Sequence, residues 1–261
     1  MATTNLAPDA APADPSTASA PVRSPDPATA ASVRSMFAAI AGRYDRANQI
    51  LSLGLHHRWR RAAVAESGAS AGERVLDCAT GTGDLAMAFR RAVGPAGEVV
   101  GTDYCEEMLA LAPAKAARAG LPVRFETADV MALPYKDESF DIASIAFGIR
   151  NVEDPVRGIR EMARVVRPGG RVVVLEFGQP GGVLFGPLYR FYSRRVLPRV
   201  GGWVSGDRSA YEYLDRTSSR FPAGGAFAEL LRATGAFRSV RLRPLTGGVA
   251  YVYVAEVGLR A

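Results

Sequence analysis

The stretch Arg74-Val75-Leu76-Asp77-Cys78-Ala79-Thr80-Gly81-Thr82-Gly83-Asp84 decides the fold of this chain. Residues 74–79 predict a buried strand, and the two glycines predict a tight turn that leads into a helix. An acidic residue, Asp103, follows about 20 residues after the second glycine, where the next predicted strand ends. This pattern predicts a nucleotide-binding crevice at the carboxyl end of a parallel sheet.

The glycine turn is compatible with two kinds of cofactor. Residues 81–86 satisfy the G-x-G-x-x-G/A pattern of dinucleotide enzymes, but a similar turn holds the amino-acid end of S-adenosylmethionine. Asp77 would repel a pyrophosphate and would favour a sulfonium centre. Asp103 can accept hydrogen bonds from ribose hydroxyls, and Asp129, after the third strand, from the adenine amine. The three acids therefore favour S-adenosylmethionine, with Gly81 and Gly83 forming the turn beneath it.

Predicted strands and helices alternate on both sides of this turn. The strands cover residues 74–79, 98–103, 123–128, 140–147 and 171–177, and the helices cover 84–93, 105–119 and 154 to the Pro168-Gly169-Gly170 stop. Such alternation predicts a parallel sheet covered on both faces. A helix over 222–234 then precedes strands 239–244 and 249–256, which predict an antiparallel hairpin. We therefore expect an α/β, Rossmann-like fold of the class I methyltransferase type, with a mostly parallel seven-stranded sheet and an antiparallel C-terminal hairpin strand.

Length and composition predict one large domain preceded by a tail. The chain has 261 residues, of which 48% are hydrophobic. Residues 1–31 are rich in Ala and Pro and contain too little apolar surface to offset chain entropy, which predicts disorder. Residues 32–261 are expected to form one domain, with cover helices at 32–62 and a basic aromatic lid at 180–221. The tail has no secretory or mitochondrial pattern and no apolar run spans a bilayer, so the cytoplasm is the expected location.

The formal net charge of +6 is concentrated in one region. Between Gly186 and Phe221, seven arginines face three acids and are interleaved with aromatic residues. A basic aromatic helix is typical of docking on anionic lipid, so we expect peripheral association with the inner face of the membrane and no nucleic-acid partner. A cover helix or a homodimer contact explains the same pattern. Cys78 and Cys105 have no metal-ligand spacing, and no metal is expected.

Three motifs outside the glycine turn are more specific than the fold. The first runs from Tyr44 to Trp59, the second is Phe147-Gly148-Ile149-Arg150-Asn151-Val152, and the third runs from Arg164 to Gly178. With a fourth stretch over 197–214, they give the chain a resemblance, from about Val33 to Glu256, to the methyltransferases of ubiquinone and menaquinone biosynthesis. Three positions depart from the family pattern: Ala47 replaces a common methionine, Gly178 replaces the usual serine, and Ala146 stands where some relatives have a serine that touches the cofactor.

The resemblance implies an S-adenosylmethionine-dependent C-methyltransferase that converts demethylmenaquinol, a prenylated demethylquinol, into menaquinol. The cofactor contacts of the family fall on Thr82, Asp103, Asp129 and Val130. Four alternatives remain open: a benzoquinol of the ubiquinone pathway, alone or in addition; a phospholipid amine or a sterol; a nicotinamide oxidoreductase; and a cofactor-binding scaffold without turnover.

Methylation of a quinol ring carbon requires a base for the adjacent hydroxyl and an electrostatic cradle for the phenolate. The candidate catalytic residues are Tyr44, Asp45, His56, Arg150 and Asn151. Arg150 and Asn151 follow the fourth strand, where a guanidinium could stabilise the phenolate or orient a water. Three of the five candidates also have a structural explanation: a salt bridge for Arg150, helix termination for Asp45, and capping for His56.

Overall fold

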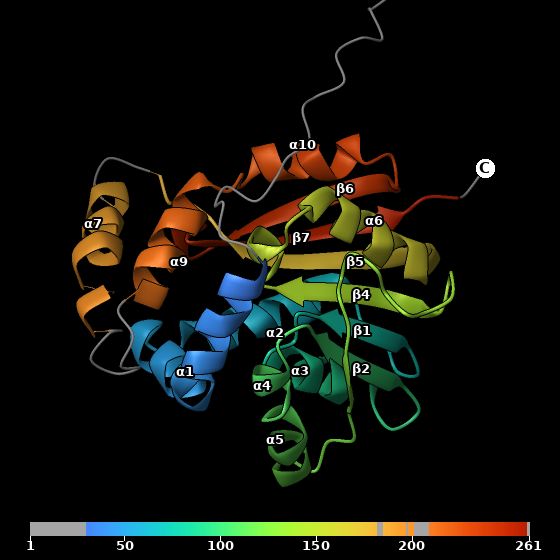
Figure 1. The fold of residues 1–261 in the computed structure, drawn as a ribbon. Coiled ribbons are helices and arrows are strands. Elements are labelled where there is room, and N and C mark those ends of the chain that lie inside the picture. The colour runs from blue at the N-terminus through green and yellow to red at the C-terminus, as the bar shows by residue number, and fades with distance from the viewer. Residues whose placement is uncertain (1–29, 182–184, 197, 201–208, 260–261) are drawn as a thin grey trace, which may run out of the picture.

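The computed structural model describes residues 30–181, 185–196, 198–200 and 209–259 (Figure 1). The predicted tail, apart from its last two residues, and parts of the predicted lid lie outside the described residues. The strands are β1 (Arg74–Cys78), β2 (Glu98–Asp103), β3 (Arg124–Thr127), β4 (Phe140–Ala146), β5 (Val166–Phe177), β6 (Phe237–Leu245) and β7 (Ala250–Val257). The α-helices are α1 (Ala30–Leu51), α2 (Leu55–Ser67), α3 (Asp84–Val93), α4 (Glu106–Leu109), α5 (Ala112–Arg118), α6 (Pro155–Val165), α7 (Phe185–Phe191), α9 (Ser209–Arg220) and α10 (Gly225–Ala233). Short turns of other helix types are η1 (Ile149–Asn151), η2 (Tyr192–Val196) and η3 (Thr246–Gly248).

The strands form one seven-stranded sheet in the order β3-β2-β1-β4-β5-β7-β6. Strands β1 to β5 are parallel, and β7 lies antiparallel between β5 and β6. This confirms the expected class I methyltransferase layout with its antiparallel hairpin strand. Because the chain leaves β1 toward β2 on one side and the sheet continues to β4 on the other, the carboxyl end of β1 is a topological switch point, where open α/β sheets bind ligands.

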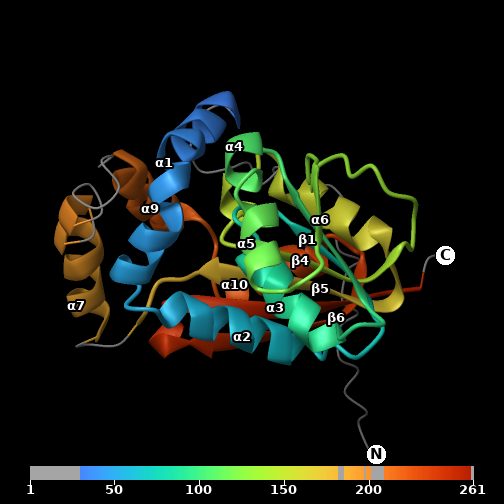
Figure 2. The ribbon, with the colours of Figure 1, turned by 90° about the horizontal axis from the view of Figure 1, so that it is seen from below.

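Helices cover both faces of the sheet (Figures 1 and 2). On one face α6 and α10 pack through Ile159, Met162 and Phe227, all completely buried. On the other face α2 and α3 pack through Ala63 and Phe89, also completely buried. The central strands are therefore apolar along nearly their whole length, as expected for a parallel sheet between two helical layers.

The long helix α1 lies at the carboxyl end of the sheet, between α4 and α9 (Figure 2). On one side Ala41 packs with Cys105 and Met108 at the start of α4. On the other side Ile40 and Ala47 pack against α9. The small side chain of Ala47 is completely buried in this contact. Helix α1 thus bridges the nucleotide side of the sheet and the C-terminal helices.

Three helix predictions were wrong in their boundaries. The first helix does not end at Asp45, because α1 continues to Leu51. The predicted helix over 105–119 is two helices, because Pro113 lacks an N–H and occupies the first turn of α5. The helix that begins after the Asp154 cap ends at Val165, ahead of the predicted glycine stop, and β5 begins at once. A Cβ on Gly170 would lie 2.6 Å from the Asp141 carbonyl, so Gly170 lies within β5 and permits its close approach to β4 instead of ending the helix. No described helix combines the length and the hydropathy that crossing a bilayer requires.

Candidate active site

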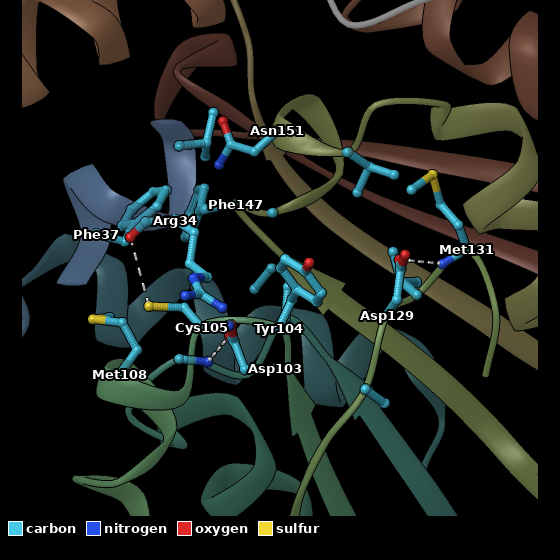
Figure 3. A pocket seen from close by; sticks show the side chains of 18 of the residues that line it. Arg34, Phe37, Asp103, Tyr104, Cys105, Met108, Asp129, Met131, Phe147 and Asn151 are labelled. Carbon is cyan, nitrogen blue, oxygen red and sulfur yellow. Dashed lines mark hydrogen bonds between the residues drawn. The ribbon is translucent and has the colours of Figure 1, made fainter. Parts of the chain in front are cut away.

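A cavity of about 290 Å³ opens at the carboxyl ends of β1 to β4 (Figure 3). The ends of the four strands supply its floor, and α1 supplies the opposite wall through Arg34, Phe37 and Tyr44. The cavity therefore lies at the switch point of the sheet, and its volume is near the lower end of the range of small-molecule sites.

Asp103, the last residue of β2, lines this cavity and is held by backbone donors. Its carboxylate accepts from the N–H of Gly81 at 2.7 Å and from the N–H of Cys105 at 2.8 Å. Burial raises the pKa of the carboxyl, although the backbone N–H groups partly oppose the rise. The two bonds tie the glycine turn to β2 and fix the carboxylate at the cavity floor, where it can accept from a ribose.

Asp129 and Val130 follow β3 and also line the cavity. The Asp129 carboxylate accepts from the N–H of Met131 at 2.8 Å, which fixes its direction (Figure 3). Val130 is nearly buried and gives an apolar surface beside the acid. An acceptor next to an apolar surface fits the edge and face of adenine. Together with Asp103, Asp129 supplies the kind of hydrogen-bond acceptors that the nucleoside half of S-adenosylmethionine requires.

The glycine turn contributes backbone to the cavity at Gly81, where φ is +56°. Gly83, with φ +83°, instead packs closely against strand β3, because a Cβ there would lie 2.9 Å from the Phe125 ring. The Thr82 side chain is buried and does not line the cavity; its hydroxyl donates to Asp45 at 2.7 Å. The turn therefore brings its backbone, more than its side chains, to the ligand.

Asp77 is buried beneath the turn and does not line the cavity. Its carboxylate accepts from the hydroxyl of Thr80 at 2.6 Å and from that of Ser144 at 2.7 Å. Burial raises the pKa of Asp77 from 3.8 to about 6, while the two hydroxyls favour the charged form. Asp77 therefore links the turn to β4 through these two hydroxyls. The predicted electrostatic effect of Asp77 on the cofactor would act at a distance, without direct contact.

Two of the five candidate catalytic residues reach the cavity, namely Tyr44 of α1 and Asn151 of η1. The amide oxygen of Asn151 accepts from the Tyr213 hydroxyl at 3.1 Å. Phe147 lines the cavity with φ +56°, a conformation that non-glycine residues seldom adopt. Its ring packs on Phe177 at 4.4 Å between centroids. Motifs far apart in the sequence therefore meet at the site.

Arg150 points away from the cavity. Its guanidinium donates to Glu176 at 2.7 Å and to the Phe147 carbonyl at 2.6 Å, and both charged side chains are buried. Phe177 lies beneath the guanidinium at 5.2 Å from the ring centroid. In this conformation Arg150 braces the strained turn at Phe147. Its direct role toward the substrate stays a prediction.

Asp45 and His56 lie in a polar cluster outside the cavity. Asp45 binds Lys115 at 2.5 Å as well as the Thr82 hydroxyl. His56 is buried, with Nδ1 2.5 Å from the Ser52 hydroxyl. Burial, together with the charge of Arg60, lowers the pKa of His56 to about 4, so the ring is neutral near pH 7. Both residues stay predictions as catalytic groups.

Several lining residues were missed by the sequence interpretation. Phe37 lines the cavity from α1, and Arg34 reaches toward Tyr104, with its guanidinium 6.0 Å from the Tyr104 ring centroid (Figure 3). Tyr104 directly follows Asp103, so its position was a usable signal. Nothing local marked Arg34, because the packing of α1 across the cavity is a tertiary contact.

The sheet order, the acids at the ends of β2 and β3 and the cavity between them define the class of S-adenosylmethionine-dependent methyltransferases. A solved structure of the same class, a SAM dependent methyltransferase from Aquifex aeolicus, shares the fold with a TM-score of 0.55 at 19% identity, covering 76% of this chain and 89% of that one. The family is settled by sequence: the model of the ubiE/COQ5 methyltransferase family matches residues 26–256, and the chain belongs to this family.

Two curated relatives show how close the match is. The chain is 54% identical over 225 residues to a protein of Bdellovibrio bacteriovorus named ubiquinone/menaquinone biosynthesis C-methyltransferase, covering 86% of this chain and 95% of the relative. It is 49% identical over 224 residues to the demethylmenaquinone methyltransferase of Deinococcus radiodurans, covering 86% and 92%. The resemblance stated from the motifs is confirmed.

Proposed function

We propose that this chain methylates a ring carbon of demethylmenaquinol and holds S-adenosylmethionine in the cavity at the switch point. One observation carries the proposal: Tyr44 and Asn151, which come from the quinone-methyltransferase motifs, line the same cavity as Asp103 and Asp129. The names of the two curated relatives support a quinone-pathway acceptor. The methyl donor and the quinol that accepts the methyl group would therefore meet in the same cavity.

The residues of the cavity divide into two groups by chemistry. Asp103 would accept from the ribose hydroxyls and Asp129 from the adenine amine, with Val130 beneath the ring and the backbone of the glycine turn at the amino-acid end. When bound, the cofactor supplies an electrophilic methyl group on a sulfonium. The side chains of Phe37 and Phe147 are apolar and exclude water from that region, so a quinol ring can approach.

Asn151 is the polar group best placed to meet the quinol. Because its amide oxygen accepts from Tyr213, its amide nitrogen is the end that can donate to a quinol oxygen. Tyr44 offers a second polar group, its hydroxyl, on the opposite wall of the cavity. We assign Arg150 to the turn that carries Asn151, and we keep Asp45 and His56 as candidates that act on the cavity through their neighbours. Holding the two reactants in near-attack geometry can supply much of the rate acceleration.

We also propose that one end of the molecule docks on the membrane that holds the prenyl tail. Leu53 is 85% exposed at φ +50°, and Leu188 and Phe191 are 65% and 61% exposed on α7. The Tyr192 hydroxyl donates to the Leu51 carbonyl at 2.7 Å, which joins the two segments. Exposed apolar side chains with the exposed Arg195 nearby suit an anionic lipid surface. Helix α7 would then cover the prenyl chain, and the remaining residues of the predicted lid lie partly outside the described residues.

The function is tested with labelled S-adenosylmethionine and short-chain acceptors. Purified protein is incubated with a demethylated naphthoquinol, a demethylated benzoquinol, a phospholipid amine and a sterol. We expect transfer to the naphthoquinol. Transfer to the benzoquinol alone would replace the proposed acceptor, and cofactor binding without any transfer would support a scaffold.

A further inference from the structure

The wall that α1 forms over the cavity is held to the cofactor side of the molecule by a polar cluster around Lys115. The Lys115 ammonium lies 2.5 Å from Asp45 of α1, 2.5 Å from Asp84 of α3 and 3.1 Å from the Thr82 hydroxyl. Thr82 in turn donates to Asp45 at 2.7 Å. One lysine thus joins α1, α3, α5 and the glycine turn.

This cluster is separate from the cavity itself. Neither Lys115 nor Asp45 lines the cavity, whereas Tyr44, the residue beside Asp45, does. Arg34 and Phe37, about two to three turns earlier on the same helix, also line it. A change at Lys115 would therefore reach a bound ligand mainly through the position of α1.

Of the described side chains of α1, only three are buried in its apolar contacts. The larger ones are partly exposed there, namely Met36, Phe37, Tyr44 and Leu51. Ala41 faces α4 and Ala47 faces α9, with Ile40 as the larger buried member. Alanines bury little area, and the hydrophobic free energy scales with the area removed from water. The polar attachments of α1 therefore add to these apolar contacts in setting its position.

We propose that Lys115 is a positioning residue that latches α1 over the cavity through Asp45 and thereby slows the release of S-adenosylmethionine. The proposal rests on the proposed placement of the cofactor between Asp103 and Asp129. Asp45 on α1 is one end of this latch, and Lys115 on α5 is the other. The latch involves no covalent step and no further ligand.

The partial exposure of the pair suits a reversible latch. The side chains of Lys115 and Asp45 are 31% and 43% exposed, and ion pairs of this kind contribute little net stability. Asp84 is more buried, and Arg60 also binds it at 3.3 Å, so the Lys115 side chain stays anchored on α3 when α1 moves. Opening therefore costs the Asp45 contacts while the rest of the cluster remains.

A latch of this kind couples to ligand binding in both directions. A cofactor that fits the closed cavity binds more weakly when the closed state is less populated. By thermodynamic reciprocity, the bound cofactor stabilises the closed position of α1. Two readouts follow, which are the release of the cofactor and the hydrogen exchange of α1 without any ligand.

The test uses the full-length variant Lys115→Met, with Lys136→Met as the matched control, because Lys136 is the other lysine of the chain and is exposed. Release of S-adenosylmethionine is followed by rapid mixing, and amide exchange is measured for residues 37–47 and for β1 and β4. We expect release on the order of fivefold faster or more in Lys115→Met. Exchange in residues 37–47 of the free protein should also accelerate, with β1 and β4 unchanged.

Two further variants separate the latch from general stability. Lys115→Arg keeps the charge and should restore slow release. Asp45→Asn and Lys115→Met should not be additive, because either change opens the same latch. Unchanged release and exchange in Lys115→Met would overturn the proposal, and so would a loss of protection that includes β1 and β4. If the wild type does not bind S-adenosylmethionine, the proposed cofactor site fails, but the exchange of α1 in the free protein still tests the latch.

Discussion

The Arg150 guanidinium donates to the Glu176 carboxylate at 2.7 Å, and both side chains are almost fully buried. Glu176 also accepts from the Phe177 N–H at 2.8 Å, and Arg150 also donates to the Phe147 carbonyl. The pair therefore fixes the turn that places Phe147 and Asn151 at the cavity. A loss of activity on its own does not distinguish this role from direct contact with substrate.

Removal of the guanidinium should destabilise the protein strongly. Arg150→Met leaves the Glu176 charge buried without its partner, and such changes cost about 3–5 kcal/mol of the free energy of unfolding. Urea denaturation measures the loss, and the double variant with Glu176→Leu should recover much of it. Should Arg150→Met keep full stability but lose turnover, Arg150 would act on the substrate and not on the turn.

The hydroxyl of Tyr213 should matter for turnover and not for cofactor binding. Tyr213→Phe removes the donor to Asn151, a hydrogen bond worth about 1 kcal/mol, so turnover should fall about fivefold at unchanged cofactor affinity. Tyr253→Phe is the control, because its hydroxyl accepts from the Gly224 N–H away from the cavity. Equal turnover of Tyr213→Phe and wild type would mean that Asn151 needs no such support.

Asp129 should select the base of the cofactor. An inosine analogue of S-adenosylmethionine carries a keto oxygen where adenine carries the amine, and the Asp129 carboxylate would repel it. We expect the wild type to bind adenosylmethionine about ten- to a hundredfold more tightly than the analogue. Asp129→Asn should narrow or reverse that ratio. Calorimetric titration gives both constants, and a ratio that the substitution leaves unchanged would remove Asp129 from the adenine site.

His56 should make the protein less stable in acid. Its pKa in the folded state is about 4, below the ordinary 6.5, so between these values the unfolded chain binds a proton that the folded chain does not. The contribution of the neutral His56 to the free energy of unfolding is fully present above pH 6.5 and is lost as the pH falls toward 4. Asp77 acts in the opposite direction, because its folded pKa is raised to about 6.

A comparison of wild type with His56→Gln isolates the histidine, since the Asp77 contribution is common to both proteins. The stability difference between them should shrink or change sign as the pH is lowered from 7 to 4.5, when measured by urea denaturation. A difference that does not vary with pH would show that His56 titrates normally in the folded state.

The exposed leucines at one end of the molecule should determine vesicle binding. Leu53→Asp and Leu188→Asp should each weaken association with anionic vesicles, because they place a carboxylate at the apolar contact. Leu242→Asp is the matched control, as Leu242 is 38% exposed on the edge strand β6. Sedimentation with vesicles measures the bound fraction, and equal binding by all three variants would refute this docking surface.

The sequence predicted the sheet and the nucleotide half of the site because both depend on local patterns. Continuous apolar runs marked the central strands, and acids at the strand ends marked Asp103 and Asp129. The departure from the family at Gly178 became explicable only in the structure: a Cβ there would lie 2.6 Å from the Gly248 carbonyl and would also meet the Tyr251 ring. The hairpin that supplies both contacts lies far along the chain.

The acceptor half of the site was less predictable because tertiary contacts decide which polar groups reach the cavity. Arg150 and Asn151 are neighbours in sequence, yet one points to Glu176 and the other lines the cavity. Lys115 carried no signal, since its three partners come from three other segments. The spacing of residues along the sequence does not show which of these side chains contact one another in the fold.

If one cavity joins the methyl donor to a quinol ring carbon, the transferred methyl group must be found on that carbon. The decisive experiment reacts the protein with S-adenosylmethionine carrying a ¹³C-labelled methyl group and a short-chain demethylnaphthoquinol, and locates the label in the product by NMR. We predict a ring-bound methyl resonance next to the prenylated carbon. A label on a quinol oxygen, or no label in the quinol at all while the cofactor binds, would show that this protein is not a quinol C-methyltransferase.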